Sequence, residues 1–246
     1  MKTTVAGSNG MVGSTITHRV MIHKVLLACG VLSALVWLGT DIIASLSYAG
    51  YNYPFAAISE LSAIGAPTRP YIGPMVTIYT VLKIAFAVGV WKSAGQKRAL
   101  RITAVLLFAW GANDLAASFF PLHTDEPVES FANTMHSILT GGIGVPLMLL
   151  PIAFGAGAGG KLFRFYSYGT FLFVILSGAV MAFIDFPRIA AHQPTPWFGL
   201  EERIVGYGDM LWMMVLAIVL LRNQPEILSL QDSNRIVDHE AATNRV

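Results

Sequence analysis

KVLLACGVLSALVWLGTDIIASLSY, residues 24–48, contains only two charged residues, Lys24 at its start and Asp41 in its second half. Its other residues are apolar, small or hydroxyl-bearing. A helix crosses the hydrocarbon core of a bilayer in about 20 residues, so this stretch is long enough to span a membrane. The residues before it lack the short apolar core and the cleavage site of a signal peptide, so we expect the span to be retained as an anchor.

Later stretches have the same character, and we place them at 72–92, 101–120, 133–155, 163–185 and 203–222. Each is apolar on most helical faces, which favours membrane-spanning over surface-lying helices. The sequence therefore predicts an all-α fold, a polytopic membrane protein built as a six-transmembrane-helix bundle over residues 24–222. We expect a cytoplasmic N-terminal segment, 1–23, before the bundle and a cytoplasmic polar tail, 223–246, after it.

The composition agrees with a surface that contacts mostly lipid. Of the 246 residues, 54% are hydrophobic and only 12% are charged, whereas soluble domains carry about 25% charged residues. The net charge of +2 and the lack of a basic patch with interleaved aromatic residues exclude a nucleic-acid-binding protein. The single cysteine, Cys29, excludes an internal disulfide bond. The expected partner is therefore the lipid bilayer.

Lysine and arginine are distributed unequally between the two sides of the predicted bundle. With six spans, both termini share a side with the links 93–100 and 156–162, and most of the 16 basic residues lie there. The opposite side has only Arg69, Arg188 and Arg203. The positive-inside rule then predicts an inner-membrane protein with both termini in the cytoplasm.

The three links on the predicted outer side are polar. They contain YPFAAISELSAIGAP (53–67), FFPLHTDEPVESFANTMH (119–136) and DFPRIAAHQPTPWFGLEER (185–203). Prolines in the first link limit helix to a short segment around Ser59, Glu60 and Ser62. We expect this segment to cover an outer pocket, with Glu60 paired to Arg203, because arginine binds a carboxylate through two parallel hydrogen bonds.

Four charged residues lie well inside the predicted spans, away from the span ends: Asp41, Lys83, Asp114 and Asp209. An ionisable group costs roughly 2.5 kcal/mol or more at the bilayer centre, so such groups face the bundle interior and find partners. A rise of about 1.5 Å per residue puts Lys83 about 14 Å and Asp114 about 20 Å above the cytoplasmic edge. The lysine stem can cover that gap, and we predict a buried Lys83–Asp114 ion pair.

These groups predict an outward-facing polar pocket that binds a lipid headgroup or a small polar ligand. The candidate pocket residues are Asp41, Ser59, Glu60, Ser62, Asp114, His136, Arg203 and Asp209. We expect no organic cofactor. A divalent metal would use His123, Asp125 and His136, which offer nitrogen and oxygen ligands at a spacing that matches no established motif.

The chain resembles a family of bacterial and archaeal membrane proteins known as domain of unknown function 998. The resemblance covers about residues 30–222 and rests on ISELSAIGAPTRP after the first span, FFP followed by acids, His136-Ser137 at the fourth span, and GLEERI leading to Trp212. It implies a multi-pass bundle, usually of six helices, and no established activity. It also places Pro67, Pro121 and Glu202 on the outer side, together with the candidate residues of the links.

Two alternative functions stay open. The first is a metal-assisted membrane hydrolase acting on lipid or amide, suggested by a looser resemblance to membrane hydrolases related to alkaline ceramidases. Those enzymes have seven spans and a late H-x-x-x-H motif, whereas the sixth span here contains no histidine. The second is a small proton- or ion-coupled transporter in which Lys83, Asp114 and Asp209 form the relay. No catalytic motif decides between these functions.

Overall fold

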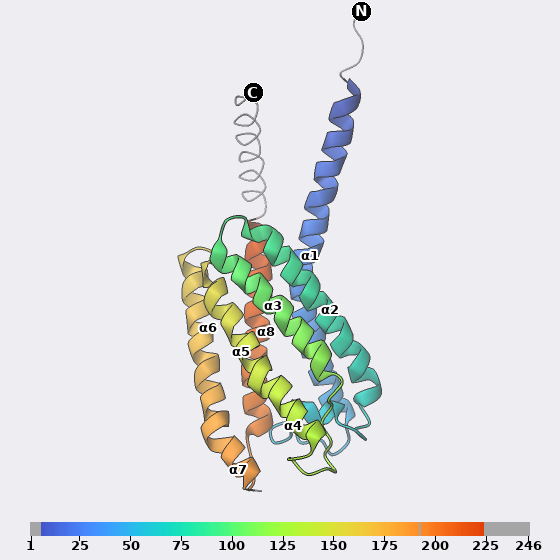
Figure 1. The fold of residues 1–246 in the computed structure, drawn as a ribbon, viewed down its shortest axis with the longest axis vertical. Helices are drawn as coiled ribbons and strands as arrows, with labels where there is room; N and C mark the ends of the chain where they lie inside the picture. Colours follow the sequence, from blue (N-terminus) through green and yellow to red (C-terminus); the bar gives the residue numbers. More distant parts are fainter. Residues whose placement is uncertain (1–5, 192, 224–246) are drawn as a thin grey trace, which may run out of the picture.

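The computed structural model describes residues 6–191 and 193–223, and its regular elements within these ranges are all helices. Six helical stretches are long and apolar enough to cross a membrane: His18–Ser47, Arg69–Ala94, Arg98–Ala117, Phe131–Ala158, Lys161–Ala190 and Phe198–Arg222. They stand side by side in one bundle (Figure 1). The predicted all-α, polytopic six-helix fold is confirmed.

The elements in chain order are α1 (Ala6–Ser47), the 3-10 helix η1 (Ile58–Ser62), α2 (Arg69–Ala94), α3 (Arg98–Ala117), α4 (Phe131–Ser137), the π-helix η2 (Ile138–Gly144), α5 (Val145–Gly155), the 3-10 helix η3 (Ala156–Ala158), α6 (Lys161–Val180), the π-helix η4 (Met181–Asp185), α7 (Phe186–Ala190) and α8 (Phe198–Arg222). Helix α1 begins at Ala6, so helix runs through most of the segment that we expected to precede the bundle. The predicted polar tail lies outside the described residues except for residue 223.

Neighbouring spans pack in chain order and close into a ring. Helix α1 contacts α2, α2 contacts α3, α3 contacts α5, α5 contacts α6, and α6 contacts α8, which returns to α1. Helix α8 also contacts α2 and α5, and it has the largest buried share of the six spans. The last span therefore presents side chains to most of the other helices.

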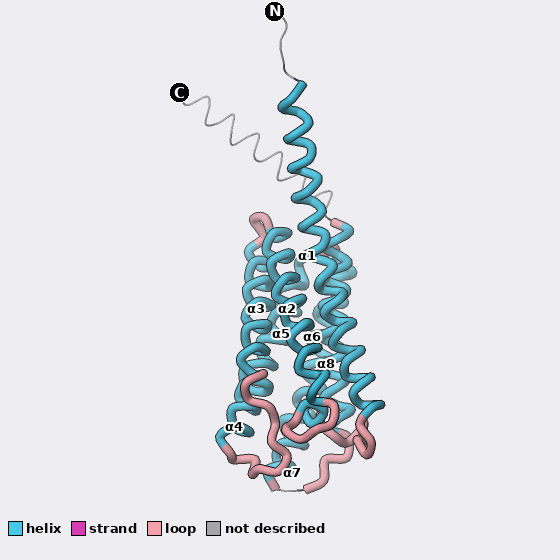
Figure 2. Tube along the Cα trace, turned by 90° about the vertical axis from the view of Figure 1, so that its right-hand side faces the viewer, coloured by secondary structure: helices cyan, strands magenta, loops and turns pink. Residues whose placement is uncertain are grey.

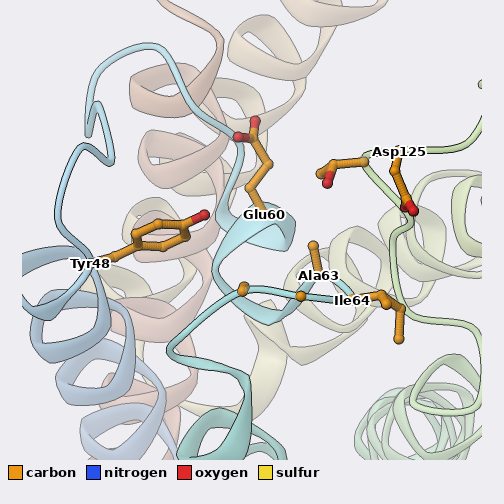
Figure 3. A pocket seen from close by; sticks show the side chains of 8 residues that line it. Tyr48, Glu60, Ala63, Ile64 and Asp125 are labelled. Carbon is orange, nitrogen blue, oxygen red and sulfur yellow. The ribbon is translucent and has the colours of Figure 1, made fainter.

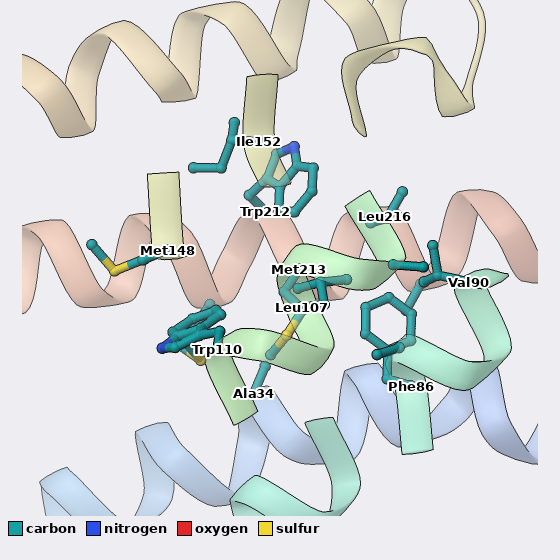
Figure 4. Packing of buried hydrophobic residues seen from close by; sticks show 14 of the residues in the cluster. Ala34, Phe86, Val90, Leu107, Trp110, Met148, Ile152, Trp212, Met213 and Leu216 are labelled. Atoms are coloured by element: carbon teal, nitrogen blue, oxygen red, sulfur yellow. The ribbon is translucent and has the colours of Figure 1, made fainter. Parts of the chain in front are cut away.

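The apolar core is centred on α8. Trp212 and Met213 are almost fully buried there, and they pack with Phe86 of α2 and Leu107 of α3 in one cluster (Figure 4). The Trp212 Nε1 group donates a hydrogen bond to the Ser167 hydroxyl of α6 at 3.0 Å, so the buried indole is satisfied. This cluster packs α8 against α2 and α3 in the interior of the bundle.

Large apolar side chains also cover the outside of the bundle. On the fifth span, Phe165 is 81% exposed and Phe183 is 82% exposed. A soluble monomer rarely exposes a contiguous apolar surface of this kind. The outer face of the helices is thus suited to lipid.

The fourth span is irregular where its glycines and prolines lie. The π-helix η2 interrupts it, and α5 begins just afterwards with Pro146 in its first turn. The Asn113 side chain of α3 donates from Nδ2 to the Leu139 carbonyl within η2 at 2.9 Å. A side chain that inserts into the helical hydrogen-bond ladder is a common cause of such an interruption.

The longer links lie together at one end of the bundle, opposite the short links 95–97 and 159–160 (Figure 2). We call this end the long-link face. It consists of the link between α1 and α2 (48–68), the link between α3 and α4 (118–130) and the link between α7 and α8. The three polar links of the sequence therefore share one face of the molecule.

Candidate functional site

A buried arginine joins the first and last spans just beneath the long-link face. Arg203 of α8 donates from Nε to Asp41 Oδ2 at 3.0 Å and from Nη2 to Asp41 Oδ1 at 2.9 Å, which makes a bidentate ion pair. Arg203 is 1% exposed and Asp41 is 3% exposed. A buried ion pair offsets its desolvation cost only where the remaining donors and acceptors are also satisfied.

The first link provides most of the other acceptors of the guanidinium, and the first turn of α8 provides one more. Nη1 of Arg203 donates to the carbonyl oxygens of Tyr53 and Gly199, both at 2.9 Å. Nη2 donates to the Tyr51 hydroxyl at 2.7 Å. The Tyr53 ring stacks against the guanidinium, with 3.9 Å between Cζ and the ring centroid. Every side-chain nitrogen of Arg203 therefore donates a hydrogen bond to an acceptor within the protein.

Tyrosine hydroxyls complete this arrangement. Tyr207, one turn after Arg203, donates to Asp41 Oδ2 at 2.6 Å. The Tyr51 hydroxyl donates toward the Ala57 carbonyl at 2.8 Å, and burial raises the pKa of Tyr51 to about 12, so the phenol keeps its proton at neutral pH. We call this group the Arg203 cluster: Asp41, Tyr51, Tyr53, Arg203 and Tyr207.

Glu60 is not the partner of Arg203, and that prediction was wrong. Glu60 Oε1 accepts a hydrogen bond from the Ala57 amide at 2.9 Å, which caps the first turn of η1. We had paired Arg203 with Glu60 because both lie on the predicted outer side of the bundle. In the structure, α8 begins five residues before Arg203 and carries its side chain into the bundle, where Asp41 is the acid within reach.

A cavity of about 310 Å³ opens on the long-link face between the first and second links (Figure 3). It is lined by Tyr48, Glu60, Ala63, Ile64, Gly65, Ala66, Thr124 and Asp125. Glu60 and Asp125 each bring a carboxylate, one from each link, and Tyr48 brings a phenol ring. No lysine or arginine is among these described lining residues. We call this space the link cavity.

The walls of the link cavity are held by hydrogen bonds between and within the links. The Ile64 amide donates to the Leu122 carbonyl at 2.8 Å, which joins the first link to the second. The buried Asn133 side chain accepts from the His123 amide and donates to the His123 carbonyl, both at 2.9 Å. These bonds fix the segment that carries Thr124 and Asp125 before any ligand arrives.

A second charged cluster lies within the spans. Lys83 of α2 is 0% exposed, and its Nζ forms an ion pair with Asp114 of α3 and donates to the Tyr79 hydroxyl at 2.7 Å. Nζ also lies 3.4 Å from the ring centroid of Trp110. Asp209 of α8 is close enough to interact electrostatically with both Lys83 and Asp114. We call Lys83, Asp114 and Asp209 the Lys83 cluster.

The structure does not bring the predicted metal ligands together. His136 Nδ1 lies 2.9 Å from the Phe120 carbonyl, and His123 Nδ1 lies 3.2 Å from Glu126 Oε1. Asp125 instead lines the link cavity. Within residues 6–191 and 193–223, no group of three or more histidine, cysteine, aspartate and glutamate side chains could hold a metal ion. Separate hydrogen-bond partners hold the two histidines in different places.

The predicted pocket residues therefore divide among several places. Asp41 and Arg203 belong to the Arg203 cluster, and Asp114 and Asp209 belong to the Lys83 cluster. Glu60 lines the link cavity from η1. On the same short helix, the Ser62 hydroxyl donates to the Ser59 carbonyl at 3.1 Å, so this serine supports the turn of the helix.

A second cavity, of about 300 Å³, opens on the side of the bundle between α6 and α8. It is lined by Tyr53, Phe173, Leu200, Arg203, Ile204, Tyr207, Gly208 and Leu211. Most of these side chains are apolar, and the nitrogens of Arg203 are already committed to protein acceptors. This cavity is suited to an apolar chain and offers little to a charged group.

Several residues that form the Arg203 cluster or hold the first link were not among the predicted site residues. Tyr51, Tyr53 and Tyr207 hold the guanidinium and its carboxylate, and Glu202 Oε2 accepts from the Ile58 amide at 2.6 Å. A sequence signal exists for one of them, since Tyr207 lies four residues after Arg203 and shares its helical face. The backbone carbonyls that Arg203 uses have no sequence signal.

Comparison with known proteins gives the family. None of the curated proteins and none of the solved structures matches the chain. The family model described as "Protein of unknown function (DUF998)" matches residues 31–219, which include all six spans in whole or in part. The chain therefore belongs to the DUF998 family of proteins of unknown function.

Proposed function

We propose that this multi-pass membrane protein binds an organic ammonium ion in the link cavity. The observation that carries the proposal is the composition of that cavity. Carboxylates from two different links and one tyrosine ring face a single space, and no basic side chain is among its described lining residues. A cation bound there would gain charge-assisted hydrogen bonds to the carboxylates and a favourable position against the aromatic ring.

The size and rigidity of the cavity favour a small ligand. Ligand pockets span about 300–1,000 Å³, and the link cavity, at about 310 Å³, lies at the lower end of this range. Glu60 is oriented by the Ala57 amide at 2.9 Å, and Oε1 makes that contact. A preformed site loses less entropy on binding than one that must first be ordered.

The source of the ammonium group is either a free amine or the amino headgroup of a lipid. We propose that the long-link face lies outside the cytoplasmic membrane, with both termini in the cytoplasm, because basic residues concentrate at the opposite end. In that orientation the cavity would face external amines, and its place among the links beyond the span ends would put it near the lipid headgroups.

The test measures binding by the purified protein in detergent. Ethanolamine, choline and putrescine are titrated by calorimetry, with ethylene glycol as a neutral counterpart of ethanolamine. We expect at least one amine to bind while ethylene glycol does not. Glu60→Gln and Asp125→Asn should each weaken binding about tenfold to a hundredfold, because a hydrogen bond to a charged group contributes about 1.5–3 kcal/mol.

Glu129→Gln is the matched control, since Glu129 is an exposed acid of the same second link that does not line the cavity. Repeating the titration in nanodiscs with and without phosphatidylethanolamine separates the two sources. Competition by the lipid identifies the headgroup as the ligand, and undisturbed binding identifies the free amine. Equal binding of ethanolamine and ethylene glycol, or equal losses in Glu129→Gln and Asp125→Asn, would rule out the proposal.

A further inference from the structure

Asp209 is a buried carboxyl group without a partner. It is 1% exposed, and neither of its side-chain oxygens has a hydrogen-bond partner among the described residues. The residue lies six positions after Arg203 on the same helix, about 9 Å further into the bundle. An ionised carboxylate in such a place would have no hydrogen-bond donor, whereas buried charges are normally paired and hydrogen-bonded.

The neighbouring charges do not balance if all of them are ionised. Lys83 supplies one positive charge, while Asp114 and Asp209 would supply two negative charges to the same cluster. Lys83 is already committed, because its Nζ pairs with Asp114. One negative charge would therefore remain in the interior of the bundle, where an isolated charge costs several kcal/mol.

The other groups around Asp209 cannot supply the missing positive charge. The titratable side chains that interact electrostatically with Asp209 include Lys83 and Tyr79 from α2, Asp114 from α3 and Tyr166 from α6. Helix α5 contains no ionisable residue. Asp41 of α1 is paired with Arg203. Apart from Lys83, these neighbours are neutral phenols, another acid or an acid already paired.

We propose that the Lys83 cluster is a proton-binding site, in which one proton is held on Asp209 in addition to the three on the Lys83 ammonium. A bound proton makes the cluster neutral, and it needs no space of its own. A metal cation would instead have to enter beside the Lys83 ammonium and would be repelled by it. This site differs from the link cavity, so it adds proton binding to the proposed ammonium binding and does not depend on it.

Charge balance predicts how many carboxyl groups of the cluster are protonated in each variant. With Lys83 present, one of the two carboxyl groups holds a proton. If Asp114→Asn removes the partner of Lys83, Asp209 takes its place and gives up the proton. If Lys83→Met removes the ammonium, both carboxyl groups hold protons. The expected number of protonated carboxyl groups in the cluster is therefore one, none and two for the wild type, Asp114→Asn and Lys83→Met.

Infrared spectroscopy of the full-length protein in nanodiscs can count these groups. The carbonyl stretch of a protonated carboxylic acid is separate from the carboxylate bands, and it shifts when the sample is exchanged into D2O. Difference spectra against the wild type should show this band lost in Asp209→Asn, lost in Asp114→Asn and gained in Lys83→Met. Asp125→Asn, which changes an exposed acid of the link cavity, should leave the band unchanged.

The proposal is overturned if the band is the same in Asp209→Asn as in the wild type, or if Lys83→Met gains none. Asparagine is nearly isosteric with aspartate, so a folded variant is expected. If Asp209→Asn does not accumulate, the opposite changes expected in Asp114→Asn and Lys83→Met still decide the question. The readout is independent of amine binding, so the failure of one proposal leaves the other standing.

Discussion

At Arg203, a planar guanidinium holds a carboxylate, a phenol and backbone carbonyls at the same time. A lysine in this position would carry the same charge but only three donors on one nitrogen. It could not make the paired contacts of 3.0 and 2.9 Å to the two oxygens of Asp41. The contacts at position 203 therefore require the planar shape of arginine as well as its positive charge.

We predict that Arg203→Lys lowers the free energy of unfolding by at least about 1.5–3 kcal/mol, the typical net value of one hydrogen bond to a charged group. The physical reason is that several acceptors around the guanidinium lose their donors together. Thermal unfolding in detergent, followed by circular dichroism, measures the loss. Arg188→Lys, at an exposed position, is the control and should melt like the wild type. Equal melting temperatures for the two variants would contradict the prediction.

At the scale of elements, the first link lies directly on the first turn of α8. The Leu200 amide donates to the Pro54 carbonyl at 3.0 Å. At Gly199 the backbones approach so closely that an added Cβ would lie 2.2 Å from the Ala56 carbonyl oxygen and 2.8 Å from the Tyr53 carbonyl oxygen. Glycine is needed at this position for the approach of another backbone.

Gly199→Ala should therefore destabilise the protein by at least about 1–3 kcal/mol, the usual cost of overpacking. The clash is with backbone atoms, which cannot rotate away, so the link must move as a whole. A protease that cuts the displaced link faster, together with a lower melting temperature, would reveal the change. In Gly169→Ala, a helical glycine of α6 with nothing within 4 Å of the added Cβ, we expect no loss. A Gly199→Ala protein as resistant as this control would refute the prediction.

The elements also show where sequence reasoning succeeds. The six spans follow from apolar runs, because a bilayer selects for length and hydrophobicity alone. The depths of Lys83 and Asp114 follow from the helical rise, and the structure brings these two residues together. The first turns of α8 were missed, because Trp197, Pro196 and two glutamates are typical of a link. The partner of Arg203 was missed for the same reason. Because α8 begins at Phe198, Arg203 lies inside the helix and its side chain can contact Asp41 of α1.

At the scale of the whole molecule, the two ends of the bundle differ in the length of their links and in their basic residues. The long-link face carries the link cavity, and the opposite end carries the short links and most of the basic residues. A membrane-impermeant thiol reagent can tell these ends apart in intact cells. The single native cysteine, Cys29, is buried and can be replaced by alanine to give a background without thiols.

In that background, we predict that Glu126→Cys is labelled in intact cells and that Lys97→Cys is labelled only after the cells are permeabilised. The reason is the positive-inside rule, which places the basic end in the cytoplasm. Both positions are exposed, so both should react once the membrane is opened. Labelling of Lys97→Cys but not Glu126→Cys in intact cells would contradict the prediction. It would mean that the long-link face, and with it the link cavity, faces the cytoplasm.

The Asp41–Arg203 pair joins residues 162 positions apart in the chain, and this separation has a consequence for biosynthesis. Asp41 enters the membrane with the first span, long before the ribosome reaches the last one. Until α8 is inserted, the acid has no countercharge, and an unpaired buried charge of this kind costs about 3–5 kcal/mol. A nascent chain that stops early therefore keeps an unpaired acid in its first span, which gives membrane quality-control proteases a means of telling unfinished chains from finished ones.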